Sequence, residues 1–148
     1  FTFDSMEAGY VAEFGHYEVT AEEIIHFAER YDPHPFHLDD DLAKKTPYKG
    51  LIASGWHTCS MTMRMLVDNY FNRGTSIGSP GVDEIRWLKP VRPGDILSIK
   101  LKVTQKKLSV SKPDRGTIWH RVSVFNHKGE KVMTMMAMTM FLRAAPAP

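Results

Sequence analysis

The spacing of hydrophobic and polar positions changes about halfway along the chain. In the first half, the apolar residues behind Thr20 recur at helical spacing: Ile24, Ile25, Phe27 and Ala28. Thr20 is followed three residues later by Glu23, which is the capping-box pattern of a helix start. We therefore predict an amphipathic helix from Thr20 to about Arg30, preceded by an edge strand and its lead-in within residues 1–19.

A second helical segment is predicted from Leu51 to about Tyr70. Its first thirteen residues carry no formal charge, so a helix here must be buried on nearly all sides. Charge returns at Arg64, which indicates that the C-terminal end of this helix reaches solvent. A shorter helix, acidic at its N-terminal end, is expected over residues 39–45.

The second half of the chain has the period of strands. Residues 82–88 form one predicted strand, and a half-buried strand follows in which Leu97, Ile99, Leu101 and Val103 alternate with polar residues. Segments 117–126 and 130–142 flank a predicted hairpin turn at Gly129. The last segment is apolar on both faces, so one face is expected on the core and the other against a second layer or a partner subunit.

Helices first and strands second indicate the α+β class. One long buried helix needs a curved antiparallel sheet around it, and this arrangement is the hot-dog fold. A chain of 148 residues is expected to bury about 70% of its unfolded surface, which suffices for one core. We therefore predict a single domain over residues 1–148, with residues 143–148 as a flexible tail.

Composition narrows the class of protein further. Hydrophobic residues make up 43% and charged residues 24%, which is ordinary for a soluble globular protein. A net charge of +2 is too small to favour nucleic acid or an anionic membrane as a partner. The single cysteine, Cys59, excludes an intrachain disulfide and fits a reducing compartment, so we expect a cytoplasmic protein. No membrane span is expected, because the uncharged stretch from Leu51 to Met63 is too short and too rich in Ser, Thr, Gly and His to cross a bilayer.

The candidate chemistry begins in "YDPHPFHL", residues 31–38. Its two prolines stop the preceding helix and are expected to enforce an extended, non-helical path. One interpretation is a solvated surface loop, and a second is a metal site formed by Asp32, His34, His37 and also His57. A third is an acid–base centre, because a carboxylate and an imidazole that converge on one water molecule can move protons near neutral pH.

A second candidate element is "LIASGWHT", residues 51–58. The small residues Ala53, Ser54 and Gly55 open the predicted helix, and a helix N-terminus presents unpaired backbone N–H groups, which would bind the oxyanion of a thioester enolate. The alternative is that Gly55 is small only because a sheet crosses the helix closely. His57 and Ser60 lie in the first turns and would border such a site, although a core histidine with a satisfied hydrogen bond is the alternative role for His57.

Together the two elements resemble a known motif. Asp32-x-His34-Pro35-x-His37, followed by Asp39 and by Ile52-Ala53-x-Gly55, resembles the hydratase motif of the MaoC-like dehydratases and (R)-specific enoyl-CoA hydratases. The stretches "VTAEEIIHFAERY" and "VDEIRWLKPVRPGD" resemble the same family. The resemblance covers roughly residues 1–142.

This resemblance implies a reaction and a role for each motif residue. Asp32 and His37 would hold the catalytic water, with Asp32 as its base and His37 passing a proton to or from the substrate α-carbon. The Gly55 N–H would bind the thioester oxygen, so that water adds to a trans-2-enoyl-CoA to give an (R)-3-hydroxyacyl-CoA. No metal or redox cofactor is implied, since coenzyme A belongs to the substrate. Family members work as homodimers or larger homo-oligomers.

The chain departs from the family motif in two places. The family asparagine is His34 here, and the Ala-His-Gly element carries Ser54 in place of its histidine. Trp56 then stands where smaller aliphatic residues are common. With His57 and Ser60, these residues are the substrate-binding candidates. A hot-dog thioesterase and a non-catalytic acyl-CoA-binding protein are the alternative functions.

Overall fold

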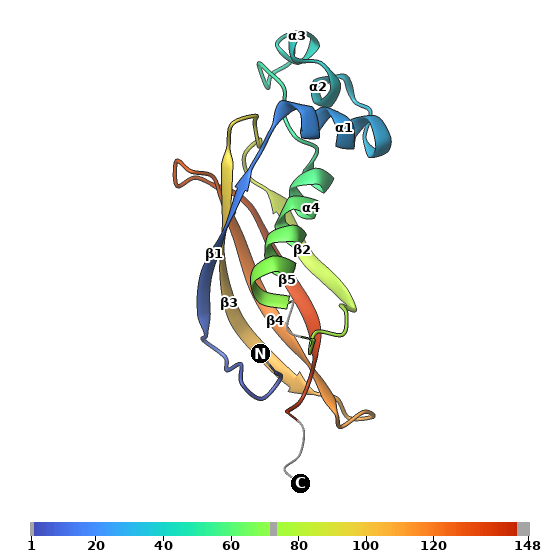
Figure 1. The fold of residues 1–148 in the computed structure, drawn as a ribbon, viewed down its shortest axis with the longest axis vertical. Helices are drawn as coiled ribbons and strands as arrows, with labels where there is room; N and C mark the ends of the chain where they lie inside the picture. Colours follow the sequence, from blue (N-terminus) through green and yellow to red (C-terminus); the bar gives the residue numbers. More distant parts are fainter. Residues whose placement is uncertain (1, 72–73, 145–148) are drawn as a thin grey trace.

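The computed structural model describes residues 2–71 and 74–144, which form a curved five-stranded sheet around one helix (Figure 1). The sheet is antiparallel throughout and has the order β1-β3-β4-β5-β2. Its strands are β1 (Val11–Glu18), β2 (Gly81–Trp87), β3 (Ile96–Leu108), β4 (Arg115–Phe125) and β5 (Lys131–Leu142). The helices are α1 (Ala21–Tyr31), α2 (Pro35–Leu38), α3 (Asp40–Ala43) and α4 (Gly55–Leu66), and α4 continues into the π-helical turn η1 (Val67–Phe71).

Helix α4 lies along the inside of the curved sheet, and α1, α2 and α3 gather beyond its N-terminal end (Figure 1). Alternation in β3 is as predicted, because Leu97, Ile99, Leu101 and Val103 are all buried. They join one core with methionines from α4 and β5. The architecture confirms the predicted α+β hot-dog fold. Within the described part of the chain, no helix combines the length and the apolar character needed to cross a membrane.

The capping box forms as predicted at the start of α1. The Thr20 hydroxyl accepts a hydrogen bond from the Glu23 N–H at 3.2 Å. The last residue of α1 is Tyr31, and Asp32 is its C-cap, whose N–H still donates to the Ala28 carbonyl. The acidic N-terminal residues predicted for the next helix are also present, with Asp39 as the N-cap of α3.

Two expectations about helix boundaries were wrong. The proline-rich segment was expected to be non-helical, yet Pro35 is the first residue of the one-turn helix α2. A proline fits there because its missing N–H has no partner in the first turn and its φ is already helical. The central helix begins at Gly55 and not at Leu51. Extended residues precede it, held by bonds from the Ile52 N–H to the Phe36 carbonyl at 3.2 Å and from the Ala53 N–H at 2.8 Å to Val91.

The strand half has the predicted hairpin between β4 and β5. Gly129 adopts a φ of 75°, the left-handed geometry that this turn needs. At the other end of β5, Arg143 forms an ion pair with Asp4, and the N–H of Ala144 donates to the same carboxylate. The rest of the tail prediction, residues 145–148, lies outside the described residues.

Candidate active site

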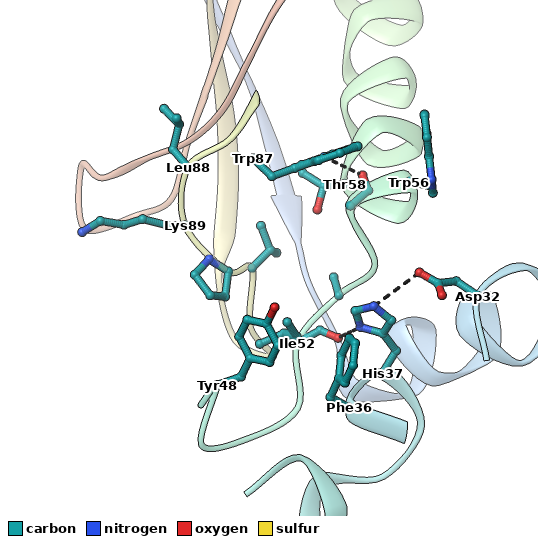
Figure 2. Close-up of a pocket in the computed structure, with 14 residues that line it drawn as sticks. Asp32, Phe36, His37, Tyr48, Ile52, Trp56, Thr58, Trp87, Leu88 and Lys89 are labelled. Carbon is teal, nitrogen blue, oxygen red and sulfur yellow. Dashed lines mark hydrogen bonds and ion pairs between the residues drawn. The ribbon is translucent and has the colours of Figure 1, made fainter. Parts of the chain in front are cut away.

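The acid–base pair lies where the end of α1 meets α2. Asp32 is the C-cap residue of α1, and the single turn of α2 brings His37 back toward it. The Nε2 atom of His37 lies 3.3 Å from Oδ2 of Asp32, and both side chains are largely buried, at 7% and 16% exposed. Figure 2 shows the two groups facing one another at the foot of α4. The two residues are therefore adjacent in a partly water-excluded position.

The orientation of the His37 ring is fixed by a backbone carbonyl. Its Nδ1 atom lies 2.7 Å from the Ile52 carbonyl oxygen, in a buried position (Figure 2). Because a carbonyl oxygen only accepts, Nδ1 carries the hydrogen. The other ring nitrogen, Nε2, then faces Asp32 with a lone pair in the neutral ring and a proton in the imidazolium. His37 can therefore exchange a proton only on the side of the carboxylate.

Asp32 has two further hydrogen-bond partners. The Ser54 hydroxyl donates to Oδ2 at 2.7 Å, and Nδ1 of His34 bonds to Oδ1. Burial by itself raises the pKa of Asp32, but hydrogen bonds from Ser54 and His34 and the charges of the two histidines outweigh it, so the pKa lies below its ordinary value. The carboxylate is thus ionised at neutral pH and available as a base.

The start of α4 lies beside this pair. Ser54 occupies the N-cap position, yet its hydroxyl serves Asp32 and makes no capping bond to the helix. The N–H groups of the first turn, including that of Gly55, therefore have no side-chain cap. A Cβ atom on Gly55 would lie 2.6 Å from Cε2 of Trp87, so close packing against β2 also requires a glycine here. The two interpretations of Gly55, a backbone N–H that binds an oxyanion and a small residue required by close helix–sheet packing, are therefore compatible.

A cavity of about 480 Å³ opens onto these groups, a size typical of small-molecule sites. Most of its walls are apolar or aromatic. The residues that line it are Asp32, Phe36, His37, Tyr48, Ile52, Ala53, Gly55, Trp56, Thr58, Trp87, Leu88, Lys89, Pro90 and Val91 (Figure 2). The polar side chains among them are few: the acid–base pair, Tyr48, Thr58 and Lys89.

The candidate residues from the sequence fall into three groups, two of which belong to this site. Asp32, His37, Gly55 and Trp56 line the cavity. His34 and Ser54 bond to the carboxylate of Asp32 from outside the lining. The structure therefore brings both halves of the motif to one site.

His57 and Ser60 lie elsewhere, in a separate hollow between β1, α1 and α4. Nε2 of His57 is 3.2 Å from Oε1 of Glu23, and its ring stacks on Phe27 with centroids 4.7 Å apart. Burial lowers the pKa of His57, partly offset by Glu23. This geometry fits the alternative of a core histidine that holds α1 against α4.

Sequence reasoning missed three of the aromatic residues that line the cavity, namely Phe36, Tyr48 and Trp87. Trp87 lies within one of the stretches that carry the family resemblance, but its spacing did not reveal which face of the strand it occupies. Phe36 sits inside the motif itself, between Pro35 and His37. The motif is defined by its polar residues and does not indicate the role of the apolar residue between them.

The metal interpretation relies on the same groups. Asp32, His34 and His37 each offer one ligand atom, and these atoms lie within 4.8 Å of one another. Two imidazoles and a carboxylate are a donor set that suits zinc or ferrous iron. In the structure, the same atoms already bond to one another, so a metal would replace the hydrogen bond and the ion pair that Asp32 makes with the two histidines.

The chain belongs to the MaoC-like domain family, which it matches over residues 7–122. Among solved structures, a MaoC-like dehydratase from Rhodospirillum rubrum is 33% identical, with a TM-score of 0.91 and coverage of 99% of both chains. The family match over residues 7–122 and the solved structure that covers 99% of the chain therefore agree on the hot-dog fold.

Two curated relatives extend the comparison. Uncharacterized protein YdeM from Bacillus subtilis is 27% identical over 129 residues, which cover 87% of this chain and 90% of the relative. A 3-hydroxybutyryl-CoA dehydratase from Methylorubrum extorquens is 30% identical over 108 residues, which cover 70% of this chain and 64% of the dehydratase.

Proposed function

We propose that the protein is an acyl-CoA hydratase/dehydratase that adds water reversibly to a trans-2-enoyl-CoA to give an (R)-3-hydroxyacyl-CoA. One observation carries the proposal: Nε2 of His37 and Oδ2 of Asp32 lie 3.3 Å apart in the wall of a cavity, beside the uncapped start of α4. An ionised carboxylate, a histidine restricted to one exchanging nitrogen and an N-terminal N–H are the groups that hydration of an enoyl thioester needs.

In the hydration direction, Asp32 takes a proton from the attacking water, and the oxygen of that water bonds to the β-carbon. The imidazolium of His37 gives its Nε2 proton to the α-carbon. The negative charge that develops on the thioester oxygen is stabilised by the Gly55 N–H at the positive end of the α4 dipole. Because the two proton-transferring groups adjoin one another in the cavity wall, they would act on the same face of the substrate, which supports syn addition.

The pair then returns to its starting state by one proton transfer. After hydration, Asp32 is protonated and His37 is neutral, with its Nε2 lone pair facing the carboxyl group. Because these atoms are only 3.3 Å apart, the proton passes from Asp32 to His37 with little movement. Dehydration follows the same steps in reverse.

The dehydratase relative acts on 3-hydroxybutyryl-CoA by its name, which supports a CoA thioester as substrate. The polar groups of the site match such a thioester, and the apolar walls match its acyl chain. As part of the proposal we regard residues 1–148 as one catalytic domain. The single cysteine, which fits a reducing compartment, supports a cytoplasmic location.

We further propose that the enzyme works as a homodimer or a larger homo-oligomer. β2 is an outer strand of the sheet, and large apolar side chains are exposed on it, directly after it, and on α4 and η1. These are Trp56, Met63, Val67, Val82, Trp87 and Leu88. An unpaired sheet edge flanked by exposed apolar side chains favours pairing with a second copy.

The test follows the absorbance of the conjugated enoyl thioester, with crotonyl-CoA as the first substrate. We expect the absorbance to fall without release of free thiol, and we expect Asp32→Asn and His37→Ala to abolish the loss. A hot-dog thioesterase would release free coenzyme A, and an acyl-CoA-binding protein would bind the thioester unchanged. Prior treatment with EDTA is expected to leave the rate unchanged, whereas a metal-dependent site would lose activity.

A further inference from the structure

A β-bulge decides where the Trp87 side chain points. Asp83 pairs with Met136, but Arg86 pairs with Thr134, so β2 contains one more residue than β5 over this interval. Glu84, within the bulge, has a φ of 54°. The extra residue reverses the alternation of side chains beyond it, so that Trp87 lies opposite the buried Met133. Trp87 therefore faces α4 and not the outer surface of the sheet.

The Trp87 indole is fixed against the first turn of α4. Its Nε1–H donates to the Gly55 carbonyl at 3.0 Å. Its ring atoms lie 2.6–2.9 Å from the position that a Gly55 Cβ would occupy. The ring of Trp56 meets it edge-on, with centroids 5.4 Å apart. The indole is thus held by a hydrogen bond and by contacts on two sides.

This position closes the cavity along the helix. In Figure 2, Trp87 crosses toward the start of α4, with the acid–base pair on one side and the following turns of the helix on the other. Cys59 of α4 also contacts Met133 of β5, the residue opposite Trp87, with their sulfur atoms 3.7 Å apart, so helix and sheet are in direct contact next to the indole. A thioester held at the Gly55 N–H would meet the indole if its acyl chain ran along α4.

We propose that Trp87 is a specificity-determining residue that restricts the enzyme to short-chain enoyl-CoA substrates of crotonyl size. The inference rests on the proposed hydratase function and names its substrate class. Trp87 is 46% exposed, but its hydrogen bond to Gly55 and its contact with Trp56 anchor the indole against added methylene groups. One methylene changes kcat/KM by roughly 10- to 200-fold in apolar pockets. A longer chain needs the space that the indole occupies.

The experiment compares kcat/KM for crotonyl-CoA and trans-2-octenoyl-CoA. The wild-type protein is expected to favour crotonyl-CoA by about 100-fold or more. Trp87→Ala should reduce this ratio by about 10-fold or more, and Trp87→Phe should give an intermediate ratio. A general loss of structure would lower both rates together and leave the ratio unchanged, so the ratio separates specificity from stability.

Trp119→Ala is the matched control. Trp119 lies on β4 and lines a different hollow with residues 107–112, so its loss should not change the ratio. Equal use of both substrates by the wild-type protein, or an unchanged ratio in both Trp87 variants, would overturn this inference while leaving the hydratase function standing. If the wild-type protein hydrates neither substrate, the proposed function fails and this inference fails with it.

Discussion

Two buried histidines near opposite ends of α4 have very different surroundings. His37 lies at the N-terminal end, with a carboxylate at 3.3 Å and a carbonyl fixing its other nitrogen. His120 lies in the core beyond the C-terminal end, 3.0 Å from the Tyr70 hydroxyl and flanked by Phe71 and Phe141. Burial lowers the pKa of His120 to about 4, only partly offset by the backbone carbonyl of Ala137.

The difference shows what makes a buried imidazole useful for catalysis. A histidine among aromatic rings stays neutral, because burial penalises its charged form more than the single backbone hydrogen bond stabilises it. A histidine beside a carboxylate, with its tautomer fixed, can gain and lose a proton in a defined direction. The first contributes to packing and the second to chemistry, although both are buried.

The largest expected effect comes from replacing each of the two histidines by glutamine. His37→Gln should lower kcat by about 1,000-fold, because a glutamine cannot carry the proton to the α-carbon. His120→Gln should leave kcat within about threefold and should lower the free energy of unfolding instead, since a core side chain is replaced. Steady-state kinetics and urea unfolding of both variants measure this contrast. Comparable losses of kcat in the two variants would contradict it.

The pH dependence of stability sharpens the comparison. The pKa of His120 is about 4 in the folded protein against 6.5 for an ordinary histidine, so the unfolded state binds the proton more tightly. The part of the unfolding free energy that depends on neutral His120 is fully present above pH 6.5 and is lost as the pH falls from there toward 4. The loss amounts to about 3 kcal/mol.

Urea unfolding between pH 7 and pH 4.5 measures this effect, with His120→Gln as the variant that lacks the group. The difference in unfolding free energy between wild type and variant should shrink as the pH falls. A constant difference across this range would show that His120 is not held neutral by the fold.

A smaller effect is expected from Ser54→Ala. The Ser54 hydroxyl helps to lower the pKa of Asp32, so its removal should raise that pKa and move the acidic limb of the kcat/KM profile to higher pH. The rate at neutral pH should fall about 10-fold, since a hydrogen bond to a charged group is lost. Ser79→Ala, at an exposed serine bonded to the Gly81 carbonyl, is the control. An unshifted acidic limb would remove Ser54 from the account.

The smallest effect is predicted for His34→Asn, which restores the residue of the family motif. An asparagine amide can donate to Asp32 as the imidazole does, and the His34 side chain is 65% exposed. We expect kcat to change by less than about threefold, because an exposed substitution that keeps its hydrogen bond perturbs little. A loss of 100-fold in steady-state kcat would instead place His34 in the chemistry or in a metal site.

Local signals in the sequence predicted most of the fold. The capping box at Thr20, the alternation in β3 and the turn at Gly129 each depend on neighbouring residues, and each is confirmed. The start of α4 was misplaced by four residues. Its preceding segment pairs with Phe36 and Val91, which are distant in sequence, and local periodicity does not report such contacts.

The candidate site was predictable in its polar residues and not in its walls. Asp32, His37 and Gly55 followed from the motif, and the structure places all three on one cavity. Trp87 could not be assigned to the cavity from the sequence. The bulge at Glu84 reverses the side-chain alternation of β2, and the residue pattern does not indicate this bulge. Similarly, α2 was not predicted, because a proline was taken only as a helix terminator, whereas Pro35 occupies the first position of a new helix.

The central claim is that Asp32 and His37 add water across the double bond of an enoyl thioester. The most direct test incubates crotonyl-CoA with the protein in D₂O and analyses the product by NMR. The account predicts 3-hydroxybutyryl-CoA with one deuterium at the α-carbon and an intact thioester, and no such product with Asp32→Asn. Hydrolysis of crotonyl-CoA to crotonate and free coenzyme A, without deuterium at the α-carbon, would contradict it.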